Sequence, residues 1–450
     1  MEGRAREAVT MSGPDDLHHH TSPDGPADDD PASVNPASVN PGDLAFWAKP
    51  WEERVAVFAE LRRADRPVLF PEPEMPWMEA FGFQRGNGHY ALVRHADVAE
   101  ASRRPEVFCS SRGTIAGTLD PPPEFMEYFG SMITMDDPRH ARLRRIVSRA
   151  FTARVVARIT DAIDAAAVRI IEDFRPKGGG DFVAEVAGRL PLKIICDLMG
   201  VPPERHDRVF ELSNLIVGSF DPEYMPDLAE LGPSVIAAGE ELRQMVHEIA
   251  AQRAERPADD LTSVLTHANV EGESLTDAEI GSFFILLIVA GNETTRNAIA
   301  HGLDLLTRHP GQRALWTSDF ERLAPTAVEE IVRYASPVNL MRRTVTRDYE
   351  LGGQWFKDGD KVLMYYCSAN RDETVFDDPD TFDITRDPNP HLGFGAPGPH
   401  FCLGAHLARQ EITVMFRELF RRLPDIRTTA PPERLESNFI NGIKHLECAF

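Results

Sequence analysis

A single cysteine inside a glycine-rich loop constrains the fold and chemistry of this chain more than any other feature. Residues 394–404 read Phe-Gly-Ala-Pro-Gly-Pro-His-Phe-Cys-Leu-Gly and lead into an amphipathic stretch, residues 403–423, that predicts a long helix. A thiol at the start of a helix lies near free backbone N–H groups and the positive end of the helix dipole, which favours the thiolate. Gly398 and Gly404 lack a Cβ, so their backbone can approach a flat group closely. We interpret Cys402 as a thiolate ligand, with a buried structural cysteine as the weaker alternative.

A second group of polar residues interrupts a long apolar stretch. Residues 274–310 read as one helix, because Thr276 and Glu279 fit a capping box and a proline closes the stretch. At 1.5 Å per residue this helix would be roughly 50 Å long and would cross a whole domain. Its centre, residues 290–295, reads Ala-Gly-Asn-Glu-Thr-Thr. Glycine and a buried carboxylate cost stability within a helix. We therefore expect this break to open a groove and carry protons, rather than to be a tolerated polar pair in the core.

The cysteine loop resembles that of the cytochrome P-450 family, the haem-thiolate monooxygenases. The family pattern is Phe, two residues, Gly, one residue, His or Arg, one residue, Cys, one residue, Gly. This chain keeps Gly398, His400, Cys402 and Gly404, and Phe394 lies one position further from the cysteine, which indicates an inserted residue. The resemblance implies a mainly helical α+β fold with a small β portion, the family's triangular prism with a long central helix over the haem. It also implies haem b, with Cys402 as the iron ligand.

The same resemblance assigns roles to the centre of the long helix. Thr294 would be the catalytic alcohol beside the bound oxygen, and Glu293 would belong to the proton relay. Ala290, Phe394 and Gly404 would lie against the haem. The consequence is an enzyme that activates O2 rather than a protein that only carries haem.

Four basic residues match family positions that neutralise the haem propionates. Residues 137–138, Asp-Pro, predict a helix start with proline at the first helical position, and His140 and Arg144 follow one turn apart. Arg343 opens a predicted strand, and His400 precedes the cysteine by two positions. Arginine suits carboxylates because its planar guanidinium offers a fork of donors.

Three further arginines of that early helix, Arg142, Arg145 and Arg149, fall on another face. A solvated charge stripe is one interpretation of this face. The other is a docking patch for an acidic electron donor. The sequence leaves both open.

A third motif has a structural role in the resembled family. Glu330 and Arg333 share a face of a helix that we expect to begin at Thr326 and to end at Ser336. In the family this pair joins a second arginine, whose position here is Arg386. We expect the three residues to lock the haem-side core.

A small β portion is predicted before the cysteine loop. Residues 343–351 and 361–366 read as strands, and the turns between them contain the glycine pair at 352–353 and Asp-Gly at 358–359. Strands this few, beside many helical segments, agree with the expected α+β fold.

Composition limits the partners and the compartment. The formal net charge of −23 argues against nucleic acid and against an anionic membrane surface. Five cysteines at scattered spacings argue for a reducing cytoplasm rather than a disulfide scaffold. No stretch is long and apolar enough for an integral membrane segment. Residues 1–41 are rich in Pro, Asp and Ser and predict a disordered tail, while residues 42–450 predict a single haem-thiolate domain. We expect a cytoplasmic monomer.

The predicted substrate pocket is apolar. Counting back from Thr294 in steps of three or four residues gives Ala290, Leu286 and Phe283 on the haem face. Family position adds six further side chains, which are Val289, Val338, Leu340, Met341, Phe439 and Ile440. Such a lining, if it is not simply core, indicates a lipophilic substrate.

The resemblance extends from Asp43 to the C-terminus and is greatest to a subfamily of high-GC bacteria that ω-hydroxylates methyl-branched lipids and also accepts cholesterol-type side chains. Shared stretches are 129–133, 136–140, 190–196, 283–297 and 391–395. The resemblance implies two electrons from NAD(P)H by way of a ferredoxin and its reductase. A narrow channel must present the terminal methyl, because positioning and not bond strength gives ω-selectivity.

Other functions are weighed against this one. A steroid-specific, terpenoid or macrolide hydroxylase is the alternative within the family. A peroxygenase would use hydrogen peroxide directly and typically lacks the acid and alcohol pair, and a haem sensor would need no oxygen groove. Glu293 and Thr294 therefore argue against both.

Overall fold

Helices make up most of the described residues, and the strands described form one five-stranded sheet and three smaller ones. The computed structural model describes residues 39–79, 82–113, 117–122, 130–150, 153–227, 230–268 and 274–450. These residues all fall within one contact unit, residues 36–450. Of the predicted tail only residues 39–41 are described, so the tail and its boundary stay predictions, and Phe129 also lies outside the described residues.

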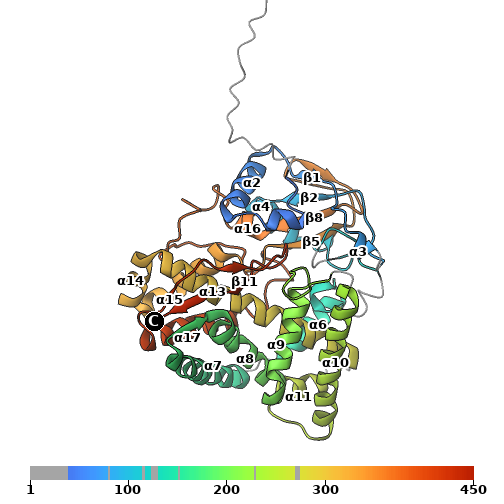
Figure 1. The fold of residues 1–450 in the computed structure, drawn as a ribbon. Helices are drawn as coiled ribbons and strands as arrows, with labels where there is room; N and C mark the ends of the chain where they lie inside the picture. Colours follow the sequence, from blue (N-terminus) through green and yellow to red (C-terminus); the bar gives the residue numbers. More distant parts are fainter. Residues whose placement is uncertain are drawn as a thin grey trace, which may run out of the picture. The chain divides into compact units, whose positions relative to one another are not determined.

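The helices are α1 (Leu44–Trp47), α2 (Trp51–Arg63), α3 (Pro76–Glu79), α4 (His95–Arg103), α6 (Arg139–Ala150), α7 (Ala153–Phe174), α8 (Arg189–Met199), α9 (His206–Val217), α10 (Leu231–Glu255), α11 (Leu261–Thr266), α12 (Asp277–Leu287), α13 (Glu293–Arg308), α14 (Pro310–Ser318), α15 (Phe320–Ala335), α16 (Tyr366–Ala369) and α17 (Ala405–Arg422). In Figure 1 α7, α8 and α17 lie together, α10 lies beside α9 and α11, and α2, α4 and α16 lie beside the largest sheet. None of the helices among the described residues is long and apolar enough to span a membrane.

The strands are β1 (Val68–Phe70), β2 (His89–Leu92), β3 (Phe108–Cys109), β4 (Gly179–Asp181), β5 (Leu340–Val345), β6 (Tyr349–Leu351), β7 (Gln354–Phe356), β8 (Lys361–Tyr365), β9 (Arg427–Thr428), β10 (Glu433–Arg434), β11 (Ile443–His445) and β12 (Glu447–Ala449). The largest sheet has the order β1-β2-β8-β5-β3, in which β2 and β8 are parallel and the other neighbours are antiparallel.

The predicted strand 343–351 is two strands in the structure. β5 begins three residues earlier than expected and ends at Val345, where the chain leaves the large sheet. β6 then pairs with β7 in a separate hairpin, and Gly352 and Gly353 form its turn with positive φ values of 58° and 78°. Glycine adopts these angles without strain, so the turn was correctly located while the strand boundaries were wrong.

The long central helix is continuous in direction but not uniform in its hydrogen bonding. It begins at Asp277 behind the predicted capping box, since Thr276 Oγ1 accepts from Glu279 N at 3.1 Å and Glu279 Oε2 accepts from Thr276 N at 3.0 Å. A π-helical turn, Ile288–Asn292, separates α12 from α13, which ends at Arg308. A π turn holds one extra residue, and such turns are frequent at functional sites.

The two other predicted helices also differ at their starts. α17 begins at Ala405 rather than at 403, because Gly404 is its N-terminal cap. α15 begins at Phe320, before the expected start at Thr326, and it tolerates Pro325 in its first half. Its predicted end is confirmed, since Ser336 adopts a left-handed conformation with φ of 43°.

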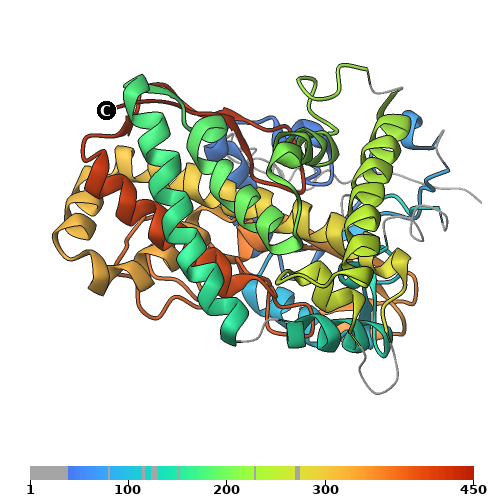
Figure 2. The same ribbon diagram turned by 90° about the horizontal axis from the view of Figure 1, so that it is seen from below.

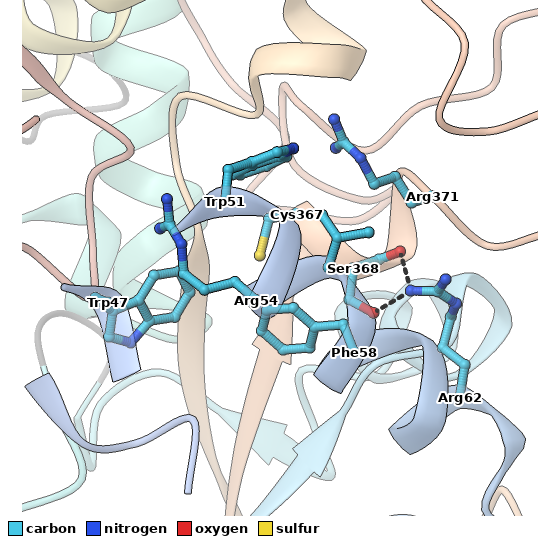
Figure 3. A pocket seen from close by; sticks show the side chains of 9 residues that line it. Trp47, Trp51, Arg54, Phe58, Arg62, Cys367, Ser368 and Arg371 are labelled. Carbon is cyan, nitrogen blue, oxygen red and sulfur yellow. Dashed lines mark hydrogen bonds between the residues drawn. The ribbon is translucent and has the colours of Figure 1, made fainter. Parts of the chain in front are cut away.

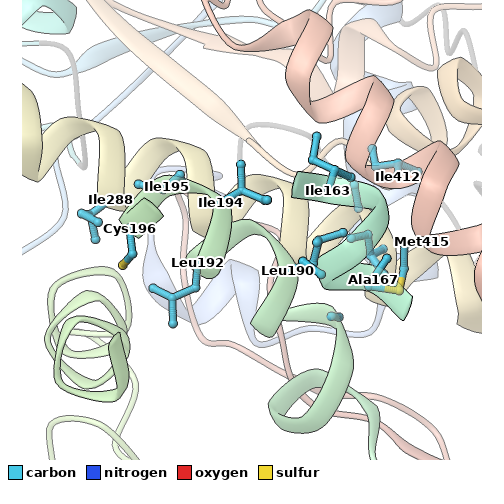
Figure 4. Close-up of a cluster of buried hydrophobic side chains, with 14 of the residues drawn as sticks. Ile163, Ala167, Leu190, Leu192, Ile194, Ile195, Cys196, Ile288, Ile412 and Met415 are labelled. Carbon is cyan, nitrogen blue, oxygen red and sulfur yellow. The ribbon is translucent and has the colours of Figure 1, made fainter. Parts of the chain in front are cut away.

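The main hydrophobic core lies where the π turn, α7, α8 and α17 meet. Figure 4 shows side chains of these four elements packed together, among them Ile163, Ile195, Ile288 and Met415. α7 and α17 lie side by side, as Figure 2 shows from below. Gly291 allows α8 to approach the central helix, because a Cβ there would lie 2.5 Å from Ile195 Cδ1. Gly291 therefore has a role in packing, whereas the sequence had suggested only that it helps to open a groove.

Candidate active site

The loop before α17 places the Cys402 sulfur at a helix start, as predicted. Cys402 N donates to Phe394 O at 2.9 Å, so the inserted residue is accommodated within a closed loop. The side chain of Cys402 is accessible. Burial by the surrounding protein nevertheless raises the pKa of its thiol, although the N–H groups of Gly404 and Ala405 and the charges of Arg144 and Arg409 all favour the thiolate. Binding of a metal ion to this sulfur would release the thiol proton.

The two loop glycines serve different purposes. Gly398 has φ of 155°, and a Cβ there would lie 2.3 Å from the carbonyl oxygen of Ser102 in α4. Its role is to let the loop pack against that helix. A Cβ on Gly404 would meet no atom within 4 Å, so this residue borders open space.

The four predicted propionate ligands lie together. The rings of His140 and His400 have centroids 4.3 Å apart, and Arg144 Nη2 donates to Phe401 O at 2.7 Å. Burial, followed by the charges of Arg343, His140 and Arg144, lowers the pKa of His400 to about 3. The four groups therefore act on one another electrostatically across α6, β5 and the cysteine loop.

This basic cluster fits a dianionic partner. His140 Nε2 is buried without a hydrogen-bond partner, and Arg343 is 3% exposed and donates from Nη1 to the carbonyl oxygen of Arg342 at 2.7 Å. Successive strand residues point to opposite faces, so Arg342 pairs with Asp120 while Arg343 joins the cluster. A buried cation of this kind is costly unless an anion pairs with it. Two propionates would meet that requirement.

Of the other arginines of α6, Arg142 is bound within the fold, while the two interpretations of Arg145 and Arg149 stay predictions. Arg142 Nη1 donates to Glu279 Oε1 at 3.0 Å and Nη2 donates to Ser274 O at 2.7 Å, so it fastens α6 to the start of α12. Arg145 also has an interaction partner, and the side chain of Arg149 lies outside the described part of the chain. Arg142 is thus neither a free docking residue nor part of a solvated stripe.

The central helix has one accessible stripe. Between Glu279 and Leu306 every side chain is buried except six, which are Leu286, Leu287, Val289, Ala290, Gly291 and Thr294. Ala290 is the one exposed residue of this stripe, and the other five are partly buried. Thr294 Oγ1 donates to Ala290 O at 2.7 Å, so its hydroxyl sits against the π turn. Phe283, which we predicted on this face, is 4% exposed and packs in the main core.

Glu293 is held by a residue that the sequence analysis did not single out. Its side chain is 0% exposed and pairs closely with Arg296, one turn further along α13. Burial raises the pKa of Glu293, and Arg296 opposes that rise. Arg296 Nη1 also donates to Asn214 Oδ1 of α9 at 2.7 Å, and Asn292 Nδ2 donates to Ser213 Oγ at 3.3 Å. The i, i+3 spacing of Glu293 and Arg296 was the available signal.

Of the five predicted lining residues outside the central helix, three are partly accessible and two are buried. Val338, Met341 and Phe439 are partly accessible, and Asn339 N donates to Phe439 O at 2.8 Å, which joins the turn to the C-terminal segment. Ile440, which bridges to Val338, is 2% exposed.

Leu340 differs from these residues. It is 1% exposed and belongs to the core cluster of Phe46, Trp47 and Phe58. Its place is therefore beneath α1 and α2, and it is not an accessible lining side chain.

The predicted structural triad is assembled in the core. Arg333 Nε and Nη2 donate to the two oxygens of Glu330 at 2.7 and 2.8 Å, and Arg386 Nε lies 3.3 Å from Glu330 Oε2. Glu330 and Arg333 are both 0% exposed. Asp383 N also donates to Glu330 Oε1 at 3.0 Å, so the segment before the cysteine loop is fixed to α15.

A second acidic residue of α15 ties that helix to the cysteine loop. Glu329 accepts from Arg409 Nη2 at 2.9 Å and lies 2.8 Å from His391 Nε2. The Arg409 guanidinium lies 4.3 Å from the centroid of the Phe394 ring. These partners outweigh burial and lower the pKa of Glu329 to about 2. No local motif marks this contact, because its members come from three separate segments.

Comparison with known proteins supports the family that the sequence and the site indicate. A model of the cytochrome P450 family matches residues 322–444. The methyl-branched lipid omega-hydroxylase of Mycobacterium tuberculosis strain H37Rv is 52% identical over 415 residues, which cover 90% of this chain and 93% of that protein. The steroid C26-monooxygenase of Mycolicibacterium smegmatis is 41% identical and covers 87% of this chain and 90% of that protein.

A solved structure gives the same result for the fold. The Mycobacterium marinum cytochrome P450 in complex with pseudoionone has a TM-score of 0.84 and 41% sequence identity, and the match covers 92% of this chain and 100% of that chain. This chain belongs to the cytochrome P450 family. It is a P450 monooxygenase, and the fold and enzyme class predicted from the sequence are confirmed.

Proposed function

We propose that this enzyme hydroxylates the terminal methyl group of methyl-branched lipids, such as branched fatty acids and isoprenoids, and that it accepts cholesterol or cholestenone side chains. The observation that carries the proposal is the stripe of apolar, accessible side chains beside Thr294, which suits a lipophilic chain. The relatives named for branched-lipid ω-hydroxylation and for steroid C26 oxidation support the particular substrates.

The family implies a haem-thiolate cofactor. When bound, this group supplies the activation of O2 and the insertion of one oxygen atom into a C–H bond. Cys402 would hold the iron, while His140, Arg144, Arg343 and His400 would hold the propionates. These residues come from three elements, so the cofactor would connect α6, β5 and the cysteine loop.

We assign proton delivery to the start of α13. Burial raises the pKa of Glu293, which favours the protonated carboxyl that a proton donor needs. Thr294 follows it on the accessible side, where its hydroxyl can donate to an acceptor in the stripe once it leaves Ala290 O. Glu293 would therefore supply the proton, and Thr294 would direct it.

Selectivity for the terminal methyl must come from positioning. A terminal methyl C–H bond is stronger than the neighbouring methine C–H bond, so reactivity alone would favour the branch carbon. We assign the positioning to a narrow channel lined by Leu286, Val289, Val338, Met341 and Phe439. Oxidation mainly at the branch carbon would contradict this assignment.

The family implies redox partners. We propose that a ferredoxin and its NAD(P)H-dependent reductase deliver the two electrons one at a time, and that the enzyme is a cytoplasmic monomer. Size-exclusion chromatography with light scattering tests the oligomeric state, and reconstitution with candidate ferredoxins tests the donor.

The decisive experiment is a spin-state titration of the purified ferric enzyme with a methyl-branched fatty acid, its straight-chain counterpart and cholest-4-en-3-one. We expect the tightest low-spin to high-spin shift with the branched acid. A tighter shift with the steroid would favour the alternative of a steroid-specific hydroxylase. No shift with any of the three would contradict the substrate assignment and direct the search to terpenoids and macrolides.

A further inference from the structure

A small cavity between α2 and α16 contains none of the residues assigned to the P450 chemistry. Its volume is about 10 Å³, which is room for one occupant the size of a water molecule. Figure 3 shows its lining, which includes Trp47, Trp51 and three arginines, Arg54, Arg62 and Arg371. The cavity is therefore small, aromatic and strongly basic.

Arg54 is the least satisfied group in this cavity. It is 4% exposed, and its Nε and Nη2 atoms are buried without a hydrogen-bond partner. Its guanidinium lies 5.7 Å from the centroid of the Trp47 ring and 5.2 Å from that of Trp51. Burial and the charge of Arg434 lower the pKa of Arg54 only to about 10, so it remains charged at neutral pH.

Comparison with the other buried arginines shows that Arg54 lacks a carboxylate partner. Seven arginines are buried among the described residues. Five of them lie within ion-pair distance of a carboxylate, and they are Arg62, Arg296, Arg333, Arg342 and Arg371. The remaining two are Arg343, which faces the expected propionates, and Arg54. A buried cation normally has an anionic partner, so Arg54 calls for one that the described side chains do not provide.

The surroundings of Arg54 add positive charge. Arg371 lies on the other side of Trp51 in Figure 3, with its guanidinium 4.6 Å from the ring centroid. Its Nη1 atom is also buried without a hydrogen-bond partner, although its Nε lies 3.3 Å from Asp380. Two guanidinium groups thus have unused donors next to the same indole.

We propose that this cavity binds one small monovalent anion, with chloride as the expected occupant, beside the unpartnered donors of Arg54. The cavity volume excludes tetrahedral oxyanions such as sulfate. The positive edges of aromatic rings can line such a site without competing for the charge.

The anion would fasten the N-terminal helices to the sheet. Arg62 already connects α2 to α16, because its Nη1 donates to Ser368 Oγ at 3.0 Å. An anion held by Arg54 of α2 in a cavity that Cys367 and Ser368 of α16 also line would add a second connection, about two turns from Arg62. Its binding should therefore stabilise the folded protein.

The test measures thermal unfolding of the full-length haem-loaded enzyme at constant ionic strength while sodium chloride replaces sodium gluconate. We expect a saturable rise in the midpoint of roughly 2 °C or more. Bromide should give a similar rise, and sulfate should give none beyond the gluconate baseline. A midpoint that does not depend on the halide would overturn the proposal.

Two variants make the test specific to the cavity. Arg54→Met keeps the length of the side chain and removes its charge, so the chloride response should disappear. Arg63→Met changes an exposed arginine of the same helix and should keep the full response. An equal chloride response in Arg54→Met would overturn the assignment of the anion to this cavity.

A diffraction experiment covers the case in which Arg54→Met does not fold. Wild-type crystals soaked in bromide should show an anomalous peak between Arg54 and Trp51. Density for a water molecule only, without an anomalous signal, would contradict anion binding.

Discussion

The carboxylate of Glu293 and the guanidinium of Arg296 form an ion pair that is sealed from solvent, with the two side chains 0% and 4% exposed. Arg296 also contacts α9 through Asn214, so the acid is held in place by two helices. A substrate that displaced α9 would therefore disturb the partner of the acid as well. The pair would link the shape of the site to the proton delivery proposed for Glu293.

Replacement of Arg296 tests this link. In Arg296→Met the pKa of Glu293 should rise further, because only the guanidinium opposes the effect of burial. We expect the pH dependence of product formation to shift to higher pH, measured with saturating substrate. Arg296→Lys should retain the wild-type profile. Arg308→Met, which breaks the pair with Asp304 at 2.9 Å on the same helix, is the matched control. An unchanged profile in Arg296→Met would exclude Glu293 as the titrating group.

Removal of the Thr294 hydroxyl should separate electron consumption from product formation. In Thr294→Ala we expect NAD(P)H oxidation to continue while the fraction that yields hydroxylated product falls, on the order of 10-fold or more. Thr294→Ser keeps the hydroxyl and should remain coupled. The ratio of product to NAD(P)H consumed is the measurement, and a wild-type ratio in Thr294→Ala would remove this residue from the proton path.

The buried triad predicts a large loss of stability. Glu330→Gln leaves Arg333 charged and unpaired in the core, which should cost about 3–5 kcal/mol of unfolding free energy. Arg322→Met breaks an exposed pair with Asp319 on the same helix and should cost less than about 1 kcal/mol. Denaturant unfolding, with haem retention as a second readout, compares the two. Similar costs for both variants would mean that the triad contributes no more than a surface pair.

The low pKa of Glu329 predicts that the folded protein loses stability in acid. Its folded-state pKa of about 2 lies below the ordinary value of 4.5, so its contribution is present above pH 4.5 and is lost as the pH falls toward 2. After allowance for solvent screening we expect about 1–2 kcal/mol at pH 7. The difference in unfolding free energy between wild type and Glu329→Gln should shrink when measured at pH 7, 4.5 and 3.5. A constant difference over this range would assign the effect to packing.

Local motifs carried most of what the sequence could predict. The capping box at Thr276, the acid and alcohol at Glu293 and Thr294, and the i, i+3 pair of Glu330 and Arg333 each depend on residues close together in the chain. Such patterns can be recognised without knowledge of the fold. Helix starts were harder to locate, because neither Asp319 nor Gly404 makes a side-chain capping hydrogen bond like that of Thr276.

The π turn explains the error at Phe283. In an uninterrupted α-helix, Phe283 and Thr294 would share a face. The extra residue in Ile288–Asn292 rotates α12 by roughly 90–100° relative to α13, so Phe283 turns into the core. Composition alone does not reveal a π turn, since its hydrogen bonds depend on how α8 packs against Gly291.

Contacts between distant segments could not be predicted from the sequence. Arg409 meets Glu329 from another helix, and Arg54 enters a cavity completed by Cys367 and Arg371. Only the assembled fold shows which charges have partners. The unpaired guanidinium of Arg54 could be recognised only after the partners of the other buried arginines were known.

The contact between Gly398 and Ser102 also bears on the order of events as the chain matures. The cysteine loop fits against the carbonyl oxygen of a helix almost 300 positions earlier, so its final shape needs both ends of the chain. Closing so long a loop is slow compared with local helix formation. A ribosome-bound chain that has not yet released its last hundred residues cannot complete the loop. Capture of the cofactor should accordingly follow the formation of this contact, late in folding.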